Sequence, residues 1–302
     1  MPQISIIVPV YNRAKVLNST LKAIQAQTFR DWECLLVDDA STDDSWNVLL
    51  TFAASDARFV PLKNERQKGA CGARNTGISH AKSPILHFFD SDDRMHENLL
   101  GELFAGLSDQ VDVVTCWTNV INVDSNKIIQ KFEHITEGNI HKELLNGKTY
   151  VDTNCALIRR DVVDKIGGWS EDCPSFQEWD FHLRLSKVAK YTTLHSHLID
   201  YYVGGNDTIS KSLPRAIRGM LYILDKYRGE FLKQALVSYM KQNFATFCRI
   251  RLLKGSGEKE LSEDFEKKYH KIAPFWVASL VKLLYGVRGV KKAVLPRIAN
   301  VK

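Results

Sequence analysis

The chain has few cysteines, and their spacing does not suggest a metal site or a disulfide scaffold. Six cysteines are scattered along 302 residues without a single C-x-x-C pair. This spacing argues against cysteine-ligated zinc modules and against small secreted domains held together by disulfides. We therefore expect reduced thiols in a cytoplasmic protein. The cysteines are Cys34, Cys71, Cys116, Cys155, Cys173 and Cys248.

Long apolar runs and an N-terminal signal are also missing. The longest apolar stretch, residues 272–287, contains Lys282 and is shorter than the roughly 20 residues that a spanning helix needs. The first residues, MPQISIIVPVYNR, show no charged leader followed by a long apolar segment. We expect neither a secretory signal nor a transmembrane helix.

The composition is that of a globular protein, but its charge is unevenly distributed. Apolar residues make up 44% and charged residues 25% of the chain. Residues 1–210 hold 21 Lys and Arg against 28 Asp and Glu, whereas residues 211–302 hold 20 against 7. An acidic body followed by a basic tail indicates two regions with different partners. We expect one domain over residues 1–212 and a basic helical region over residues 213–302.

Apolar, β-branched runs alternate with helix-compatible segments in the first third of the chain. This rhythm predicts parallel strands joined by right-handed crossovers, and near-continuous apolar strands indicate a sheet covered on both faces. The expected fold is α/β, with a mostly parallel sheet flanked by helices. We expect strands at residues 3–9, 33–38, 58–62, 84–90, 111–121 and 149–159, and helices at 161–167, 176–188 and from 214 to about 253.

Polar loops follow the first four predicted strands. Carboxyl ends of parallel strands meet at one edge of a sheet, where α/β proteins bind ligands. We therefore expect the four loops to form one ligand-binding crevice. They are residues 9–13 (PVYNR), 38–43 (DDASTD), 63–74 and 90–93 (DSDD).

The fourth loop carries three carboxylates in four positions. Asp90, Asp92 and Asp93 repel one another when ionised unless a cation or a donor-rich ligand lies among them. Asp and Ser are also ordinary turn and helix-capping residues, which is the alternative interpretation. In the third loop, GACGARNTGI places glycines around Arg74 at a helix start, which suits an anion.

Six motifs in order resemble glycosyltransferase family 2, the inverting enzymes of the GT-A fold. The resemblance covers residues 3–212 and implies a nucleotide-binding half, residues 1–93, and an acceptor-binding half, residues 94–212. It does not extend to the basic tail. The motifs are ISIIVPVYNR, LLVDDASTDDS, GACGARNTGI, FFDSDD, IGGW and QEWDFHLRL.

The resemblance implies a role for each loop. Asp39, with Asp38 beside it, would read a uracil base that Pro9 and Tyr11 line, and Arg74 would form the opposite wall. Helix capping by Asp39 and a plain loop position for Tyr11 are the alternatives. Mg²⁺ or Mn²⁺ would bind to two of the three carboxylates Asp90, Asp92 and Asp93 and to the donor diphosphate.

The general base implied by the resemblance is Glu178, although the family more often has Asp at this position. Alternatively, Glu178 pairs with His182 and Asp180 with Arg184, since each pair is four residues apart on a helix. Tyr202 stands where the family often has Arg. The further candidates for diphosphate or acceptor contacts are Trp179, Asp180 and Lys211.

The function implied is inverting transfer of a sugar from a nucleotide-sugar, most often a UDP-sugar, to an acceptor hydroxyl. Glycan or lipid-linked acceptors of cell-surface polysaccharide or lipopolysaccharide assembly fit such an enzyme. The alternative is a catalytically weak or inactive sugar-nucleotide-binding or scaffold protein at the membrane surface. A sugar-nucleotide pyrophosphorylase is disfavoured, because PVYNR lacks the glycine-rich loop that such an enzyme needs after its first strand.

The basic tail is also rich in apolar and aromatic residues. Residues 271–302 contain no Asp or Glu, and such a segment suits an anionic membrane surface. The protein would then be cytoplasmic and peripheral on the inner face of the membrane. A helical hairpin packed on the catalytic domain is the alternative. Nucleic acid is not an expected partner, since no nucleic-acid-binding motif accompanies the charge.

Overall fold

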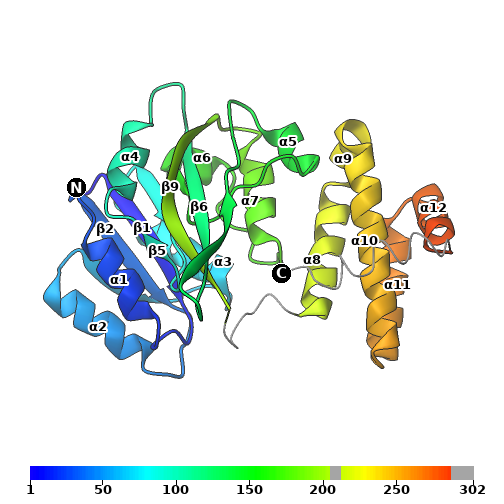
Figure 1. Ribbon diagram of the computed structural model, residues 1–302, viewed down its shortest axis with the longest axis horizontal. Helices are drawn as coiled ribbons and strands as arrows, with labels where there is room; N and C mark the ends of the chain where they lie inside the picture. The colour runs from blue at the N-terminus through cyan, green and yellow to red at the C-terminus, as the bar shows by residue number, and fades with distance from the viewer. Residues whose placement is uncertain (205–211, 287–302) are drawn as a thin grey trace. The chain divides into compact units, whose positions relative to one another are not determined.

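The computed structural model describes residues 1–204 and 212–286 of the chain (Figure 1). Lys211 and the end of the basic tail lie outside the described residues. The chain divides into two compact units, and the second unit includes two short stretches that the sequence prediction assigned to the catalytic domain. The first unit comprises Met1–His141, Thr149–Glu171 and Phe181–Asp207, and the second Lys142–Lys148, Asp172–Asp180 and Thr208–Lys302.

The first unit is built on a nine-stranded sheet. Its first four strands pair in parallel in the order β3-β2-β1-β4, and almost every residue of β1 and β2 is buried. Continuous apolar sequence therefore correctly predicted strands with both faces covered. The bounds are Ile4–Val10 for β1, Trp32–Asp38 for β2, Phe59–Lys63 for β3 and Ile85–Phe88 for β4.

Three helices cover the two faces of these strands. Helices α1, Leu17–Gln25, and α2, Ser45–Ser55, lie on one face, and α3, Ala70–His80, lies on the other (Figure 1). The side changes because the chain adds β2 and β3 on one side of β1 and then crosses back to add β4 on the other. The carboxyl ends of the neighbouring strands β1 and β4 therefore mark the topological switch point, where ligands bind in such sheets.

Two glycines of α3 are required by packing within the first unit. A Cβ on Gly77 would lie 2.4 Å from Cγ2 of Ile7, and one on Gly72 would lie 1.9 Å from the carbonyl oxygen of Gln67. Both separations are too short for a real contact. Gly77 therefore lets α3 pack closely against β1, and Gly72 lets α3 approach the loop that precedes it.

Beyond β4 the sheet is mixed, so "mostly parallel" describes its first half only. Strand β8 is antiparallel to β4 and β6, and β9 is parallel to β6. The predicted strand at 149–159 is confined to the four residues of β8. The remaining strands are β5, Arg94–Met95; β6, Val113–Asn122; β7, Lys127–Phe132; β8, Ala156–Arg159; and β9, Tyr191–Val203.

The predicted short helix after β8 is confirmed. It ends at Lys165, and two glycines that follow it, Gly167 and Gly168, have positive φ, the conformation that suits glycine after a helix. The predicted helix at 176–188 is also present, although shorter. The helices of this stretch are α4, Leu99–Ala105; α5, His141–Leu145; α6, Arg160–Lys165; and α7, Gln177–Leu185.

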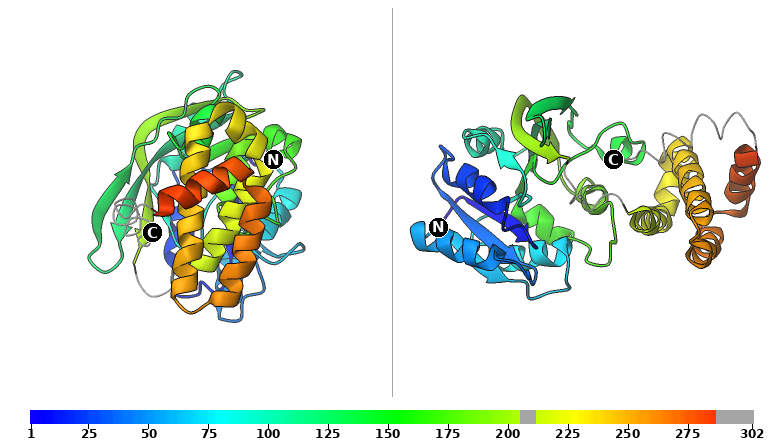
Figure 2. Two further views of the ribbon diagram at one scale, coloured as in Figure 1. Left: turned by 90° about the vertical axis from the view of Figure 1, so that its right-hand side faces the viewer. Right: turned by 60° about the horizontal axis from the view of Figure 1, so that its bottom comes forward.

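The second unit contains a group of helices from the C-terminal part of the chain. The hydroxyl of Ser212 caps the first of them by accepting from the backbone N–H of Arg215. Helix α12 crosses α10 (Figure 2), which also packs against α8, α9 and α11. Among the described residues, no helix combines the length and hydropathy needed to cross a membrane. The helices are α8, Leu213–Lys226; α9, Arg228–Gln234; α10, Leu236–Gly255; α11, Lys259–Ile272; and α12, Phe275–Gly286.

Candidate functional site

The loops that follow β1 and β2 are hydrogen-bonded to each other. Asn12 has a positive φ of 51°, and its Oδ1 accepts from the backbone N–H of Thr42 at 2.8 Å. The backbone N–H of Asn12 donates to Oγ of Ser41 at 3.0 Å. These bonds fix the loop that carries Tyr11, whose side chain is 40% exposed.

Asp38 and Asp39 are both buried at the end of β2, but they differ in their partners. Asp39 accepts from Nδ2 of Asn64 at 2.6 Å and from the backbone N–H of Gly69 at 2.8 Å. Asp38 accepts from Nζ of Lys63 through Oδ2, while its Oδ1 has no hydrogen-bond partner in the described part of the chain.

Asp39 was alternatively expected to cap the helix that follows β2. Helix α2 begins after Asp44 and has no side-chain cap, so Asp39 does not cap it. Asp39 instead holds the third loop. The resemblance implied that Asp39 reads the base, whereas the buried acceptor atom without a partner among the described residues belongs to Asp38.

Arg74 lies buried at the switch point. Its Nη2 donates to Oδ1 of Asp90 at 2.8 Å, and its guanidinium lies 4.4 Å from the ring centroid of Trp169. Trp169 in turn stacks on Phe181 at 4.1 Å between centroids and exchanges two hydrogen bonds with the amide of Asn75. The packed rings and the amide hold the guanidinium beside the carboxylate.

The three carboxylates of the fourth loop have different environments. The side chains of Asp90 and Asp92 are 30% and 45% exposed, and Nε of Arg13 lies 3.3 Å from Asp92. Asp93 is 2% exposed; it accepts from Nδ2 of Asn154 at 2.6 Å and from the backbone N–H of Tyr202 at 3.0 Å. Asp93 therefore joins three segments of the sheet.

Burial and mutual repulsion raise the pKa values of Asp92 and Asp93. Burial, with repulsion from Asp92 and Asp90, raises the pKa of Asp93 well above its usual value. Desolvation and the neighbouring Asp90 raise the pKa of Asp92. A cation at this loop would relieve both effects.

Few of the described side chains are placed to ligate a metal ion together. Within residues 1–204 and 212–286, no group of three His, Cys, Asp or Glu side chains is arranged to hold a metal ion. Asp90 and Asp92 are the two partly exposed carboxylates of the loop, and their oxygens are the ligands that Mg²⁺ and Mn²⁺ prefer. Any further ligands would have to come from a bound molecule or from water.

Helix α7 carries the candidate base, and its N-terminal residues belong to the second unit. Phe176, directly before the helix, has a φ of 59°, a conformation that costs a bulky residue about 1–3 kcal/mol. Glu178 is partly buried in the first turn. Trp179 donates through Nε1 to the carbonyl of Leu144 at 3.1 Å, as a packed residue of this unit.

Asp180 does not lie on the helix surface, where the alternative interpretation placed it in a pair with Arg184. Asp180 is buried and accepts from Nζ of Lys226 at 2.6 Å and from Oη of Tyr227 at 2.9 Å. Nη1 of Arg184 donates to the carbonyls of Ile166 and Gly168. Asp180 is therefore a structural anchor within the second unit.

His182, which Glu178 was expected to contact as an alternative, is buried in the first unit. Its Nδ1 lies 3.0 Å from Oη of Tyr191. Burial, assisted by the charge of Arg184, lowers the pKa of His182 to about 3. The ring is neutral at physiological pH and serves as a core residue.

Sequence reasoning missed Asn154. Its Oδ1 accepts from the backbone N–H of Asp90 at 2.7 Å, while its Nδ2 donates to Asp93. A lone Asn before a strand carries no recognisable motif, so only the pairing of β8 with β4 reveals it.

Parallel strands whose switch point carries a buried Arg and crowded carboxylates define an α/β domain with a charged edge at the place where such sheets bind ligands. The chain belongs to glycosyl transferase family 2, because the model of that family matches residues 5–167. This finding confirms the resemblance drawn from the six motifs.

Individual relatives are similar over smaller parts. A β-1,3-glucosyltransferase of Escherichia coli, WfgD, whose name gives UDP-Glc and α-D-GlcNAc-diphosphoundecaprenol as its substrates, is 35% identical over 129 residues. The match covers 43% of this chain and 50% of the relative. The chain thus spans about half the length of this curated relative.

Solved structures support the GT-A fold. Staphylococcus aureus TarS residues 1–349, in complex with UDP-GlcNAc, matches with a TM-score of 0.66 and 18% identity over 98% of this chain and 90% of that one. The mannosyltransferase PcManGT of Pyrobaculum calidifontis, in complex with GDP-Man and Mn²⁺, matches with a TM-score of 0.59 and 14% identity over 99% and 85%.

The contrast between Asp93 and Asp92 predicts different effects on stability. Replacing Asp93 with Ala leaves two buried donors without an acceptor and should lower the free energy of unfolding by about 1–3 kcal/mol. Asp92→Ala, at a partly exposed position, should change it by less than about 0.5 kcal/mol. Urea unfolding followed by circular dichroism measures both; equal losses in the two variants would contradict these assignments.

Proposed function

We propose that the protein is a glycosyltransferase that moves a sugar, with inversion, from a nucleotide-sugar to an acceptor hydroxyl in cell-surface polysaccharide or lipopolysaccharide assembly. The observation that carries the proposal is the convergence of Arg74, Asp90 and Asp92 at the switch point between β1 and β4. Cationic and carboxylate groups at this edge suit a diphosphate and its metal ion. Membership of the family supports the same reaction class.

The nucleotide base would bind beside Asp38 and Asp39. The buried Oδ1 of Asp38 can accept the ring N–H of uracil, while Asp39 holds the loop that forms the pocket wall. Pro9 and Tyr11 would line the base. UDP is the proposed nucleotide, in keeping with the UDP-sugars in the names of WfgD and the TarS complex.

Asp90 and Asp92 would hold Mg²⁺ or Mn²⁺ together with diphosphate oxygens, and the bound ion would neutralise charge on the leaving group. Arg74 would keep Asp90 oriented and would add positive charge at the same place. Asp93 was a third candidate ligand; we propose that it instead positions Asn154 and β9. Lys211 stays a candidate diphosphate contact.

Glu178 would act as the general base. Its carboxylate takes the proton of the acceptor hydroxyl while that oxygen attacks the anomeric carbon and the bond to the nucleoside diphosphate breaks on the opposite face. The strained backbone at Phe176 fixes where α7 starts, and hence where Glu178 lies. Asp180 is held by Lys226 and Tyr227, so it is the weaker candidate for this role.

Nucleotide binding should depend on metal and on Asp92. Calorimetric titration should detect UDP more strongly than GDP, only with Mn²⁺ or Mg²⁺, and Asp92→Ala should weaken UDP binding by about tenfold or more. Asp109→Ala, at an exposed carboxylate elsewhere in the first unit, is the matched control and should bind like the native protein. If neither nucleotide binds in any condition, the transferase proposal fails.

Removing the base should separate catalysis from binding. Glu178→Gln should reduce sugar transfer and donor hydrolysis by roughly 10²–10⁴-fold and leave UDP affinity unchanged, whereas Glu178→Asp should retain part of the rate. Radiometric transfer assays and calorimetry measure the two quantities. A native protein that binds UDP-sugars but hydrolyses none would favour the alternative of an inactive sugar-nucleotide-binding protein.

We also propose that α12 contacts an anionic membrane surface. Its residues Val277 and Val281 are buried within the second unit, while Phe275, Trp276 and Leu283 are 88%, 50% and 68% exposed. An exposed apolar face with Trp, in a segment without acidic residues, suits the interface of a bilayer with negative lipids. Such binding would bring the enzyme to lipid-linked acceptors.

Vesicle sedimentation tests this contact. The native protein should bind to vesicles that contain phosphatidylglycerol more strongly than to pure phosphatidylcholine, and the combined change Trp276→Ser with Leu283→Ser should weaken binding by about tenfold or more. Leu50→Ser, at a 45% exposed position on α2, is the control and should bind normally. If the double variant binds to these vesicles as strongly as Leu50→Ser does, α12 has no role in membrane binding.

A further inference from the structure

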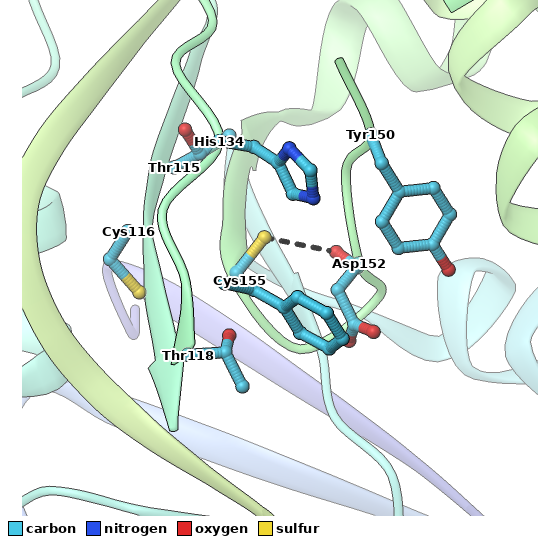
Figure 3. A pocket seen from close by; sticks show the side chains of 8 residues that line it. Thr115, Cys116, Thr118, His134, Tyr150, Asp152 and Cys155 are labelled. Atoms are coloured by element: carbon cyan, nitrogen blue, oxygen red, sulfur yellow. Dashed lines mark hydrogen bonds between the residues drawn. The ribbon is translucent and has the colours of Figure 1, made fainter. Parts of the chain in front are cut away.

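A pocket opens on the first unit (Figure 3). It is a shallow pocket, and the empty space of about 310 Å³ within it includes open solvent. Strands β6 and β7 and the segment before β8 form it, so it lies in the half of the sheet beyond β4. Its lining residues are Thr115, Cys116, Thr118, Phe132, His134, Tyr150, Asp152 and Cys155.

The lining combines aromatic rings at the rim with small residues at the base. The rings of His134 and Tyr150 meet edge to face with centroids 6.2 Å apart, and Figure 3 shows them beside each other with Asp152 close by. Thr118 and Cys155 are buried. Burial lowers the pKa of His134, so its ring is neutral at physiological pH.

Hydrogen bonds connect this pocket to the carboxylate loop. Asn154, which binds both Asp90 and Asp93, also donates through its backbone N–H to Oδ1 of Asp152 at 3.0 Å. The thiol of Cys155 donates to the carbonyl of Asp152 at 3.3 Å (Figure 3). One turn, residues 152–155, therefore supplies a wall of the pocket and a support of the diphosphate site.

Neutral aromatic rings beside a carboxylate match the chemistry of a sugar. The C–H face of a pyranose can lie on the electron-rich face of an aromatic ring, and a carboxylate accepts hydrogen bonds from hydroxyls. A base and diphosphate would occupy the loops after β1–β4, whereas this pocket is built from strands that follow β4 in the order of the sheet.

We propose that this pocket binds the terminal pyranose of the acceptor, with Tyr150 and His134 against its C–H face and Asp152 accepting from its hydroxyl groups. The inference rests on the proposed function, because it needs a sugar acceptor beside the diphosphate. It assigns these three residues to acceptor recognition and not to donor binding.

Saturation-transfer NMR with free monosaccharides tests the assignment. N-acetylglucosamine, N-acetylgalactosamine, glucose and galactose are each offered at millimolar concentration to the UDP- and Mn²⁺-loaded native protein, and at least one should receive saturation. Tyr150→Ala and Asp152→Asn should weaken that binding by roughly threefold to tenfold. Tyr150→Phe, which keeps the ring, should retain it. Ile129→Ala, at an exposed β7 position outside the pocket, is the control.

Donor measurements keep the two proposals separate. The Tyr150 variants, which lie outside the turn that supports the carboxylate loop, should bind UDP with Mn²⁺ and hydrolyse the UDP-sugar with unchanged KM. If they instead raise the KM of donor hydrolysis, the pocket holds the donor sugar and the inference is overturned. It is equally overturned if no monosaccharide binds, or if Tyr150→Ala and the native protein bind equally well. Failure of UDP binding in the native protein would refute the proposed function itself.

Discussion

Repulsion among the carboxylates of residues 90–93 is the constraint on which the rest of the site depends. Three negative groups within four positions cannot all stay ionised and close together without compensation. Arg74 compensates Asp90, Arg13 compensates Asp92, and two donors from distant segments hold Asp93. Each compensating group comes from a different part of the chain, so the loop holds those parts together.

The two candidate groups of catalytic residues are stabilised by different means. Arg74 packs against stacked aromatic rings, whereas the start of α7 is held by the pairing of the buried Asp180 with the partly exposed Lys226. Removing Lys226 would leave the buried charge of Asp180 without this compensation, which costs more than the net contribution of the pair. Asp180 is therefore a structural support of the helix turn that carries Glu178.

The sequence predicted the first half of the sheet well because its strands are continuously apolar and each ends in a polar loop. It did not predict β7, whose residues are mostly exposed, or β9, where buried and partly exposed positions are interspersed. The sequence named the candidate site residues as a group, but neighbours such as Asp38 and Asp39 differ only in tertiary contacts. The partner of Asp180 lies 46 residues further on, beyond the reach of any local pattern.

The loop between β3 and α3 is already ordered by the protein's own contacts. Asp39 binds Asn64 and Gly69, and Glu171 accepts from the backbone N–H of Gln67 at 3.2 Å. A ligand that binds beside such an ordered loop would not have to immobilise it, so little conformational entropy would be lost on binding. Association should then approach rigid docking, and differences in affinity between nucleotides should arise mainly in their dissociation rates.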